Sequence, residues 1–348
     1  MTDETIETGV SRRRYLRAAG VLGVGGTVAL AGCSGDGGDG GDDGGGNDGG
    51  DGTDGDDGGG DGGTPAPTEL SVTAVWTDAE AETFKQVLSH AQSNANVETE
   101  YHPRTTDGLK SGTLMDYQSG VAPADIVVMP FPSRIASDGE KGHLSPMGDV
   151  WDESNFVVSP SSVSAGGTTY AAPFKMDLKP GFWYRKSFFD EHGLSAPESY
   201  DEFTTLLEDL KGISGVDAPI ASGNGTGWPL SDLTEAFFLR QDDGAQLQQD
   251  LISGDADFTD DRVVTALEEI KALHDSGYFS QTRDFAVQYE YFWQNSTPLY
   301  FQGSFTPSFD AIKDPSDLGV FRLPGTSGMV GSVNWLTVPK YADNVDAV

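Results

Sequence analysis

The chain has 348 residues, and its formal charge of −34 excludes an ordinary nucleic-acid binder, because backbone phosphates would repel so acidic a protein. Residues 1–33 carry a charge of +1 and residues 34–63 carry −10, which leaves −25 on the other 285 residues. The length suggests two or three domains, and the single cysteine excludes a disulfide within the chain.

The first 33 residues have the layout of an export signal. A basic stretch, Ser11 to Arg17, is followed by 14 small or apolar residues that end at Ala31, too few for a bilayer span of about 20. The stretch SRRRYLR resembles a twin-arginine signal. Leu30-Ala31-Gly32-Cys33 resembles the lipobox of bacterial and archaeal lipoproteins, in which Cys33 is lipidated after cleavage. A disordered basic terminus is the alternative, but we expect 1–33 to be a twin-arginine signal peptide with a lipobox.

Residues 34–67 are expected to form a disordered linker. Residues 34–63 contain 10 Asp and 17 Gly and no apolar side chain, so they can bury nothing and their charges repel one another. The following segment TPAPT stiffens the exit from this linker. We therefore expect a tether between a lipid-modified Cys33 and a folded body.

From Glu69 onward, strand and helix patterns alternate, which predicts an α/β fold with parallel strands. In chain order the expected elements are a strand over 70–76, a helix over 78–92, strands over 97–101 and 125–129 with a helix over 109–117 between them, and extended runs over 168–174 and 181–184. Helices follow over 199–211, 230–240, 245–252 and 260–275, the last with Thr259 as its cap. Short strands over 298–301, 318–323 and 333–338 complete the pattern.

The sequence lacks the usual signatures of catalysis and metal binding. The five histidines stand in no metal-ligand spacing, and there is no GxSxG motif. The acidic run from Asp255 to Asp261 lacks the glycine and closing glutamate of a calcium loop, so helix capping explains it better. A pair of glycosidase carboxylates cannot be selected among 42 acidic residues of the body. We expect no cofactor, no metal and no enzymatic activity.

Several aromatic residues stand at strand ends or in polar loops. Core packing accounts for each of them singly. Together they recur beside Gly, Asn and Asp, a composition typical of sugar sites, where flat rings pack against the sugar and polar groups bind hydroxyls. They are Trp76, Phe131, Trp183, Trp228, Phe305 and Trp335.

Several segments together resemble extracellular solute-binding proteins of family 1, the maltose-binding-protein-like receptors of carbohydrate ABC importers. The segments are FWYRKSFFDEHGLSAPESYDEFTTLLEDLK (182–211), TYAAPFKMD (169–177), FTDDRVVTALEEIKALHDSGYF (258–279), PLYFQGSF (298–305), and GVFRLPG with GSVNWLTVPK near the end. Arg185 stands where the family usually has asparagine, and Tyr200 replaces a tryptophan. The family's pattern continues well beyond Lys340, whereas this chain ends at Val348.

The resemblance implies two lobes of a type II periplasmic-binding-protein-like fold, joined by hinge crossovers near 174–176 and 330–332. Lobe 1 would comprise 68–174 with 331–348, and lobe 2 would comprise 175–330. The implied ligand-binding residues are Trp76, Asp78, Met129, Phe131, Lys175, Asp177, Trp183, Trp228, Asp232, Gly303, Phe305, Asn334 and Trp335.

We therefore expect a monomeric receptor, lipid-anchored on the outer face of the cell membrane, that delivers a mono- or oligosaccharide to an ABC permease. Alternatives are a receptor for a polyol, polyamine or peptide, a surface-anchored polysaccharide hydrolase or lyase, and a structural cell-surface protein. The sequons at Asn224 and Asn295 are candidate glycosylation sites. The charge of −25 on the body suggests an extreme halophile, in which salt screens self-repulsion.

Overall fold

The computed structural model describes residues 66–348, apart from the side chain of Asp78. The expected signal peptide, the lipobox with Cys33 and nearly all of the tether lie outside the described residues. Within 66–348, no helix combines the length and apolar character that a membrane span requires. The described residues form two larger sheets, each with its own covering helices, and one two-stranded hairpin, and we call the parts built on the two larger sheets lobe 1 and lobe 2.

Lobe 1 is built on a five-stranded sheet with the order β2-β1-β3-β10-β6. β1 pairs in parallel with β2 and β3, as the alternating sequence pattern predicts. β10 enters from the far end of the chain and pairs antiparallel with both β3 and β6, so the complete sheet is mixed, which the pattern of the first three strands does not predict. The strands are β1 Thr68–Thr73, β2 Val97–Tyr101, β3 Ile126–Met129, β6 Ala172–Lys179 and β10 Val330–Thr337, with a small hairpin of β4 Ser164–Ala165 and β5 Thr168–Thr169.

Helices cover this sheet because their apolar faces match it. In α2 (Asp78–Asn94), Ala81 and Phe84 recur at helical spacing and are buried. The expected helix over 109–117 consists of a π-helical turn, Gly108–Gly112, that continues into α3 (Thr113–Gln118). α4 (Pro132–Glu140), which the sequence pattern does not predict, begins with proline at its first position, where the missing N–H has no cost.

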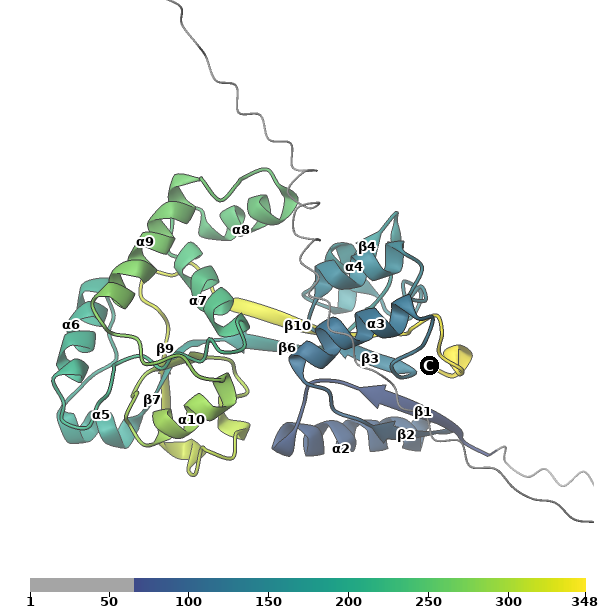
Figure 1. Ribbon diagram of the computed structural model, residues 1–348, viewed down its shortest axis with the longest axis horizontal. Coiled ribbons are helices and arrows are strands. Elements are labelled where there is room, and N and C mark those ends of the chain that lie inside the picture. Colours follow the sequence, from purple (N-terminus) through teal and green to yellow (C-terminus); the bar gives the residue numbers. More distant parts are fainter. Residues whose placement is uncertain (1–65) are drawn as a thin grey trace, which may run out of the picture. The chain divides into compact units, whose positions relative to one another are not determined.

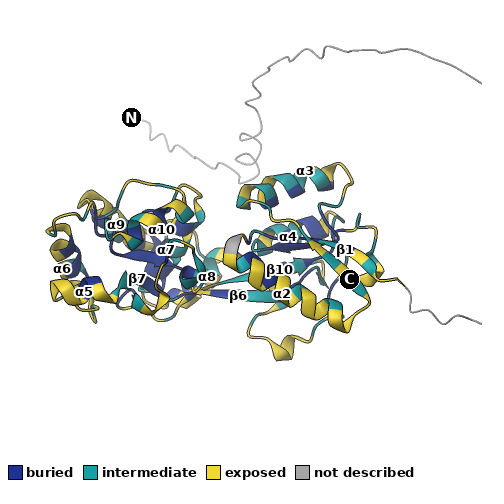
Figure 2. Cartoon of the chain, turned by 90° about the horizontal axis from the view of Figure 1, so that it is seen from below, coloured by how far each residue is buried: buried dark blue, intermediate teal, exposed yellow. Residues whose placement is uncertain are grey.

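Lobe 2 is built on an antiparallel sheet with the order β8-β7-β9 and a layer of helices. Its largest core cluster joins Phe182 of β7 to Phe203 of α6 and Phe237 of α7, and all three are fully buried. Figure 2 shows buried residues gathered on the inward faces of these elements. The elements are β7 Gly181–Arg185, α5 Lys186–His192, α6 Tyr200–Lys211, α7 Trp228–Phe238, α8 Gly244–Ser253, α9 Asp261–Asp275, α10 Phe285–Trp293, β8 Tyr300–Gln302 and β9 Leu318–Phe321.

Helix caps agree with the sequence in one case and correct it in another. Ser199 and Glu202 form a capping box at the start of α6, in the acidic first turn that the sequence indicated. The expected cap of α9, Thr259, is wrong: Asp260 occupies the cap position and accepts a hydrogen bond from the Arg262 backbone N–H. Thr259 instead donates its backbone N–H and its hydroxyl to Asp257. Asp260, one residue nearer the helix than Thr259, caps α9 because aspartate is preferred over threonine at this position.

Two long strands lead from the sheet of lobe 1 toward lobe 2. β6 and β10 are eight residues each and pair antiparallel from Ala172 to Lys179 (Figure 1). The expected crossover segments, 174–176 and 330–332, therefore belong to one two-stranded ribbon, in which 330–332 pairs with 177–179. Gly181 then starts β7 with φ 141°, where a Cβ would lie 2.0 Å from the carbonyl oxygen of Phe321. Only glycine allows this approach, so β7 can follow β6 directly.

Candidate functional site

Three charged side chains lie on one face of β6. Lys175, Asp177 and Lys179 occupy alternate positions of the strand, and alternate residues of a strand project to the same side of the sheet. Asp177 and Lys179 are buried and Lys175 is half-buried, whereas Met176 and Leu178 between them are exposed. We call the three residues the charged row. Burial of charge on a strand that leads from one lobe to the other marks this face as the candidate site.

In lobe 1 the charged row continues into a polar network beside Trp76. Lys175 Nζ lies 2.7 Å from Glu80 Oε1 and 3.1 Å from Asp177 Oδ1. Asn334 Nδ2 donates to Asp177 Oδ2 at 3.1 Å from the paired strand β10. The Lys175 ammonium also lies 5.3 Å from the centroid of the Trp76 ring, within the range of a cation–π contact.

In lobe 2 the row ends at a cluster of two aromatic rings and a carboxylate. Lys179 Nζ lies 3.0 Å from Asp232 Oδ2 and 4.8 Å from the ring centroids of both Trp228 and Phe305. The two rings meet at 72°, with centroids 6.1 Å apart. The Ser304 backbone N–H donates to the Leu178 carbonyl at 2.7 Å, which ties the loop bearing Phe305 to β6.

The ionisable groups of the site are shifted by burial and by one another. Burial disfavours the Lys175 cation, but the hydrogen bond and charge of Glu80, with Asp177, outweigh burial and raise its pKa. Burial raises the pKa of Asp232, and the charge of Lys179 offsets part of that effect. Burial and the charge of Asp232 raise the pKa of Glu235, one turn further along α7.

The remaining residues predicted for the site lie in other surroundings. Met129 and Trp335 are fully buried in one core cluster of lobe 1, and Phe131 packs against that cluster, so the side chains of Met129 and Trp335 do not reach solvent. Trp183 packs in a small cluster of lobe 2 and donates its indole N–H to the Gln302 carbonyl at 3.0 Å. The side chain of Asp78 lies outside the described residues.

Gly303 acts through its missing side chain. A Cβ at this position would lie 2.3 Å from the ring of Phe305, so any larger residue would displace that ring. Gly303 therefore positions Phe305 against Lys179, and its predicted place in the site has a steric reason.

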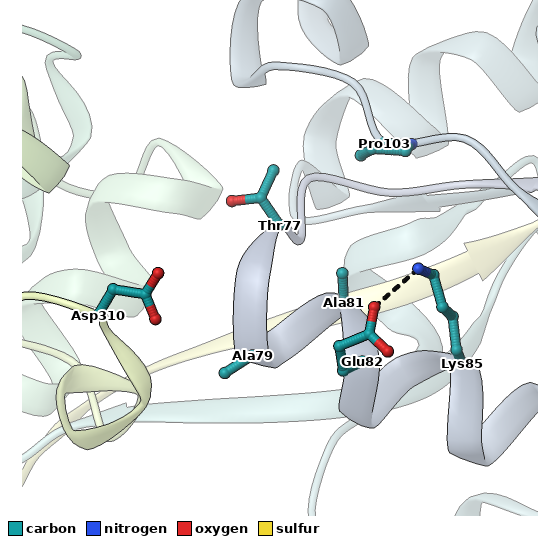
Figure 3. A pocket seen from close by; sticks show the side chains of 7 residues that line it. All are labelled: Thr77, Ala79, Ala81, Glu82, Lys85, Pro103 and Asp310. Carbon is teal, nitrogen blue, oxygen red and sulfur yellow. Dashed lines mark hydrogen bonds and ion pairs between the residues drawn. The ribbon is translucent and has the colours of Figure 1, made fainter.

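An open groove of about 530 Å³ lies next to this site, at the start of α2 (Figure 3). Glu82 and Lys85 form an ion pair of 2.8 Å along one side of it, and Asp310, from the segment between β8 and β9, lies across from Thr77. The groove has no aromatic side chain in its lining, which comprises Thr77, Ala79, Ala81, Glu82, Lys85, Pro103 and Asp310. We therefore centre the candidate site on the charged row, which has both rings and buried polar groups.

Two functional candidates, Glu80 and Lys179, escaped the sequence analysis. Glu80 is one of many acidic residues on a helix, and nothing in the sequence distinguishes it. Lys179 had a signal, because Lys175, Asp177 and Lys179 alternate within one strand-like run, and buried strands seldom carry charges. Among residues 66–348, no three His, Cys, Asp or Glu side chains gather in a way that could hold a metal ion.

Comparison with known sequences identifies related proteins. The sequence model of one family, described as bacterial extracellular solute-binding protein, matches residues 75–348. An uncharacterised ABC transporter extracellular-binding protein of Pyrococcus horikoshii is 37% identical over 278 residues, which are 79% of this chain and 65% of that protein. The alpha-glucosides-binding periplasmic protein AglE of Rhizobium meliloti is 29% identical over 262 residues, 69% of this chain and 56% of that protein. The chain spans less than two thirds of either relative.

Comparison with solved structures identifies proteins of the same fold. The bacterial solute receptor AcbH, reported to prefer β-D-galactopyranose, has a TM-score of 0.70 at 20% identity, with 80% of this chain and 74% of that chain covered. At this identity the similarity establishes the fold alone, which is that of two-lobed binding proteins with the lobes joined by crossover strands.

Proposed function

Since the chain belongs to the family of bacterial extracellular solute-binding proteins, whose related members serve ABC transporters, we propose that it captures a carbohydrate between its lobes and delivers it to an ABC permease. The ligand is a mono- or oligosaccharide, bound without chemical change. The protein acts as a monomer, and binding is signalled by closure of the lobes.

One observation supports this proposal above the others: the charged row has aromatic rings at both of its ends. Trp76, which is 5% exposed and packed in a core cluster, lies at its lobe 1 end, and the half-buried rings of Trp228 and Phe305 lie at its lobe 2 end. Rings that pack against the faces of a sugar, with fixed carboxylates and amides to bind its hydroxyls, are the usual composition of such sites. Asp232 pairs with Lys179 through Oδ2, and a carboxylate has further lone pairs that can accept from a ligand hydroxyl.

The buried residues of the expected site take a supporting role in this proposal. Met129 and Trp335 lie beneath the sheet surface and stabilise lobe 1, while the ligand contacts come from the half-buried groups Lys175, Trp228 and Phe305. The lobe bounds expected from the sequence, 68–174 with 331–348 and 175–330, would fall within β6 and at the start of β10. Closure would then bend the backbone where β6 and β10 leave the sheet.

The place of action rests on residues outside the described part of the chain. Export through the twin-arginine signal, lipidation of Cys33 and a tether over 34–67 would hold the receptor on the outer face of the membrane. The acidic body suits a surrounding of molar salt. These features fit a receptor that works outside the cell beside its permease.

Tryptophan fluorescence tests the proposal. The protein is titrated in molar KCl with neutral sugars, and each mixture is then analysed for products. Saturable quenching with the sugar intact supports a receptor, and Trp228→Phe, which keeps a ring but removes that fluorophore, shows whether the signal comes from the proposed site. Release of new reducing ends would instead indicate a hydrolase, and saturation only by a polyol, polyamine or peptide would assign another solute class.

A further inference from the structure

Lys179 is held in an enclosure that has the composition of a cation-binding site. Its ammonium lies 4.8 Å from the centroids of Trp228 and Phe305 and 3.0 Å from a carboxylate oxygen of Asp232, and its side chain is 4% exposed. We call Trp228, Phe305 and Asp232 the lysine cage. Lysine is rarely buried, and here two rings and a carboxylate surround its charge.

The lysine cage matches the chemistry by which proteins bind organic ammonium ions. Aromatic rings attract a cation within about 6 Å of their centroids, and a carboxylate supplies the balancing charge. The rings stand nearly perpendicular and form two walls of a box. Gly303 leaves room for the Phe305 ring, since a Cβ at position 303 would displace it. The chain thus fills a preformed cation site with its own side chain.

We propose that Lys179 is a specificity-determining residue, an internal cation that occupies the lysine cage and thereby excludes organic ammonium ions, which leaves the site to uncharged ligands. A free ammonium ion would have to displace a covalently attached competitor whose effective concentration is very high. A second positive charge beside Lys179 would also be repelled. The specificity for uncharged solutes rests on the proposed function, whereas occupation of the cage by Lys179 rests on its geometry alone.

The same geometry makes Lys179 a positioning residue for its neighbours. It contacts both rings and the carboxylate at once, so its removal frees Trp228, Phe305 and Asp232 from one common partner. A purely structural role would be lost with the side chain and would not be restored by a soluble cation. Restoration by the right cation is therefore the property that separates the two roles.

Chemical rescue of Lys179→Ala tests the proposal. The atoms deleted in this variant correspond to a propylammonium ion, and 1-propanol is its uncharged counterpart of equal length. Binding is followed by tryptophan fluorescence and calorimetry while propylammonium chloride replaces KCl at constant chloride, so that ionic strength does not change. Lys211→Ala is the matched control, because Lys211 also lies near an aromatic ring, 5.5 Å from that of Tyr278, but on the exposed surface.

We expect Lys179→Ala to bind propylammonium saturably, at concentrations at least about tenfold below any at which the wild type or Lys211→Ala gives a signal, with no such gain for 1-propanol. Tetramethylammonium should show the same preference. Equal binding of propylammonium and 1-propanol, or saturable binding of either cation by the wild type, would overturn the proposal. If Lys179→Ala is unfolded in KCl, folding in propylammonium chloride supports the proposal, and absence of rescue overturns it. Failure of the wild type to bind any sugar would remove the proposed function but leave these outcomes unchanged.

Discussion

Replacement of Asp177 by alanine tests whether the charged row is held together as the structure has it. Asp177 is buried, its Oδ2 accepts from Asn334, and its Oδ1 pairs with Lys175. Loss of a hydrogen bond to a charged group costs about 1.5–3 kcal/mol. Loss of the lysine pair adds about 0–1 kcal/mol, because Lys175 is 32% exposed and keeps Glu80 as its partner. We expect Asp177→Ala to lower the free energy of unfolding by about 1.5–4 kcal/mol.

Guanidinium unfolding in molar KCl measures this loss, with the exposed Asp209→Ala of α6 as the control for removal of one negative charge. A double-mutant cycle with Asn334→Ala isolates the hydrogen bond, and we expect a coupling of about 1–2 kcal/mol. A destabilisation equal to that of the control, together with a coupling near zero, would refute the network described for Asp177.

Three further predictions concern the two lobes and the body charge. Trp228→Ala should weaken sugar binding by at least about tenfold with little loss of stability, whereas Trp335→Ala should lower stability by about 3–5 kcal/mol because its ring is buried. Calorimetric titration measures the affinity and denaturant unfolding measures the stability of each variant. Unchanged affinity in Trp228→Ala would contradict the proposed site. The pKa of Glu235 is raised above 4.5, so the native state holds its proton more tightly, and the stability this carboxyl contributes is present below pH 4.5 and lost as pH rises through the raised value. The free energy of unfolding of Glu235→Gln should therefore exceed that of the wild type by a few tenths of a kcal/mol at neutral pH, which is the size of a like-charge pair one helical turn apart. In acid the two proteins should be equally stable. Unfolding free energies with the same dependence on pH in both proteins would contradict this prediction. Dialysis from molar to 0.1 M salt, where the Debye length grows from about 3 to 10 Å, should unfold the body, and an unchanged circular dichroism spectrum there would contradict a halophilic design.

The sequence predicts most strands and helices of this fold because their periods are clear. Phe203, Leu206, Leu207 and Leu210 recur at helical spacing behind the capping serine, and α6 forms there. α10 was missed because five of its nine residues are aromatic, which hides any amphipathic period. The antiparallel insertion of β10 between β3 and β6 could not be derived either, since pairing between segments more than 150 residues apart leaves no local pattern.

For the site, residue types were easier to predict than exposure. Lys175, Asp177, Trp228, Asp232 and Phe305 do lie along or beside one strand face. The resemblance also placed Met129 and Trp335 in the site, yet both are core residues. Alternate positions of β3 and β10 point to opposite faces, and the sequence does not say which face is covered. The role of Lys179 depends on two rings from different segments, and no linear motif records that.

Identification of the retained solute tests the central claim most directly. The protein is incubated in molar KCl with a mixture of neutral oligosaccharides, polyols, polyamines and short peptides, separated from unbound solutes by gel filtration, and denatured to release its ligand for mass spectrometry. The account predicts one intact, uncharged carbohydrate at close to one molecule per chain. Retention of a polyamine or a peptide, or recovery of shortened sugars alone, would contradict it.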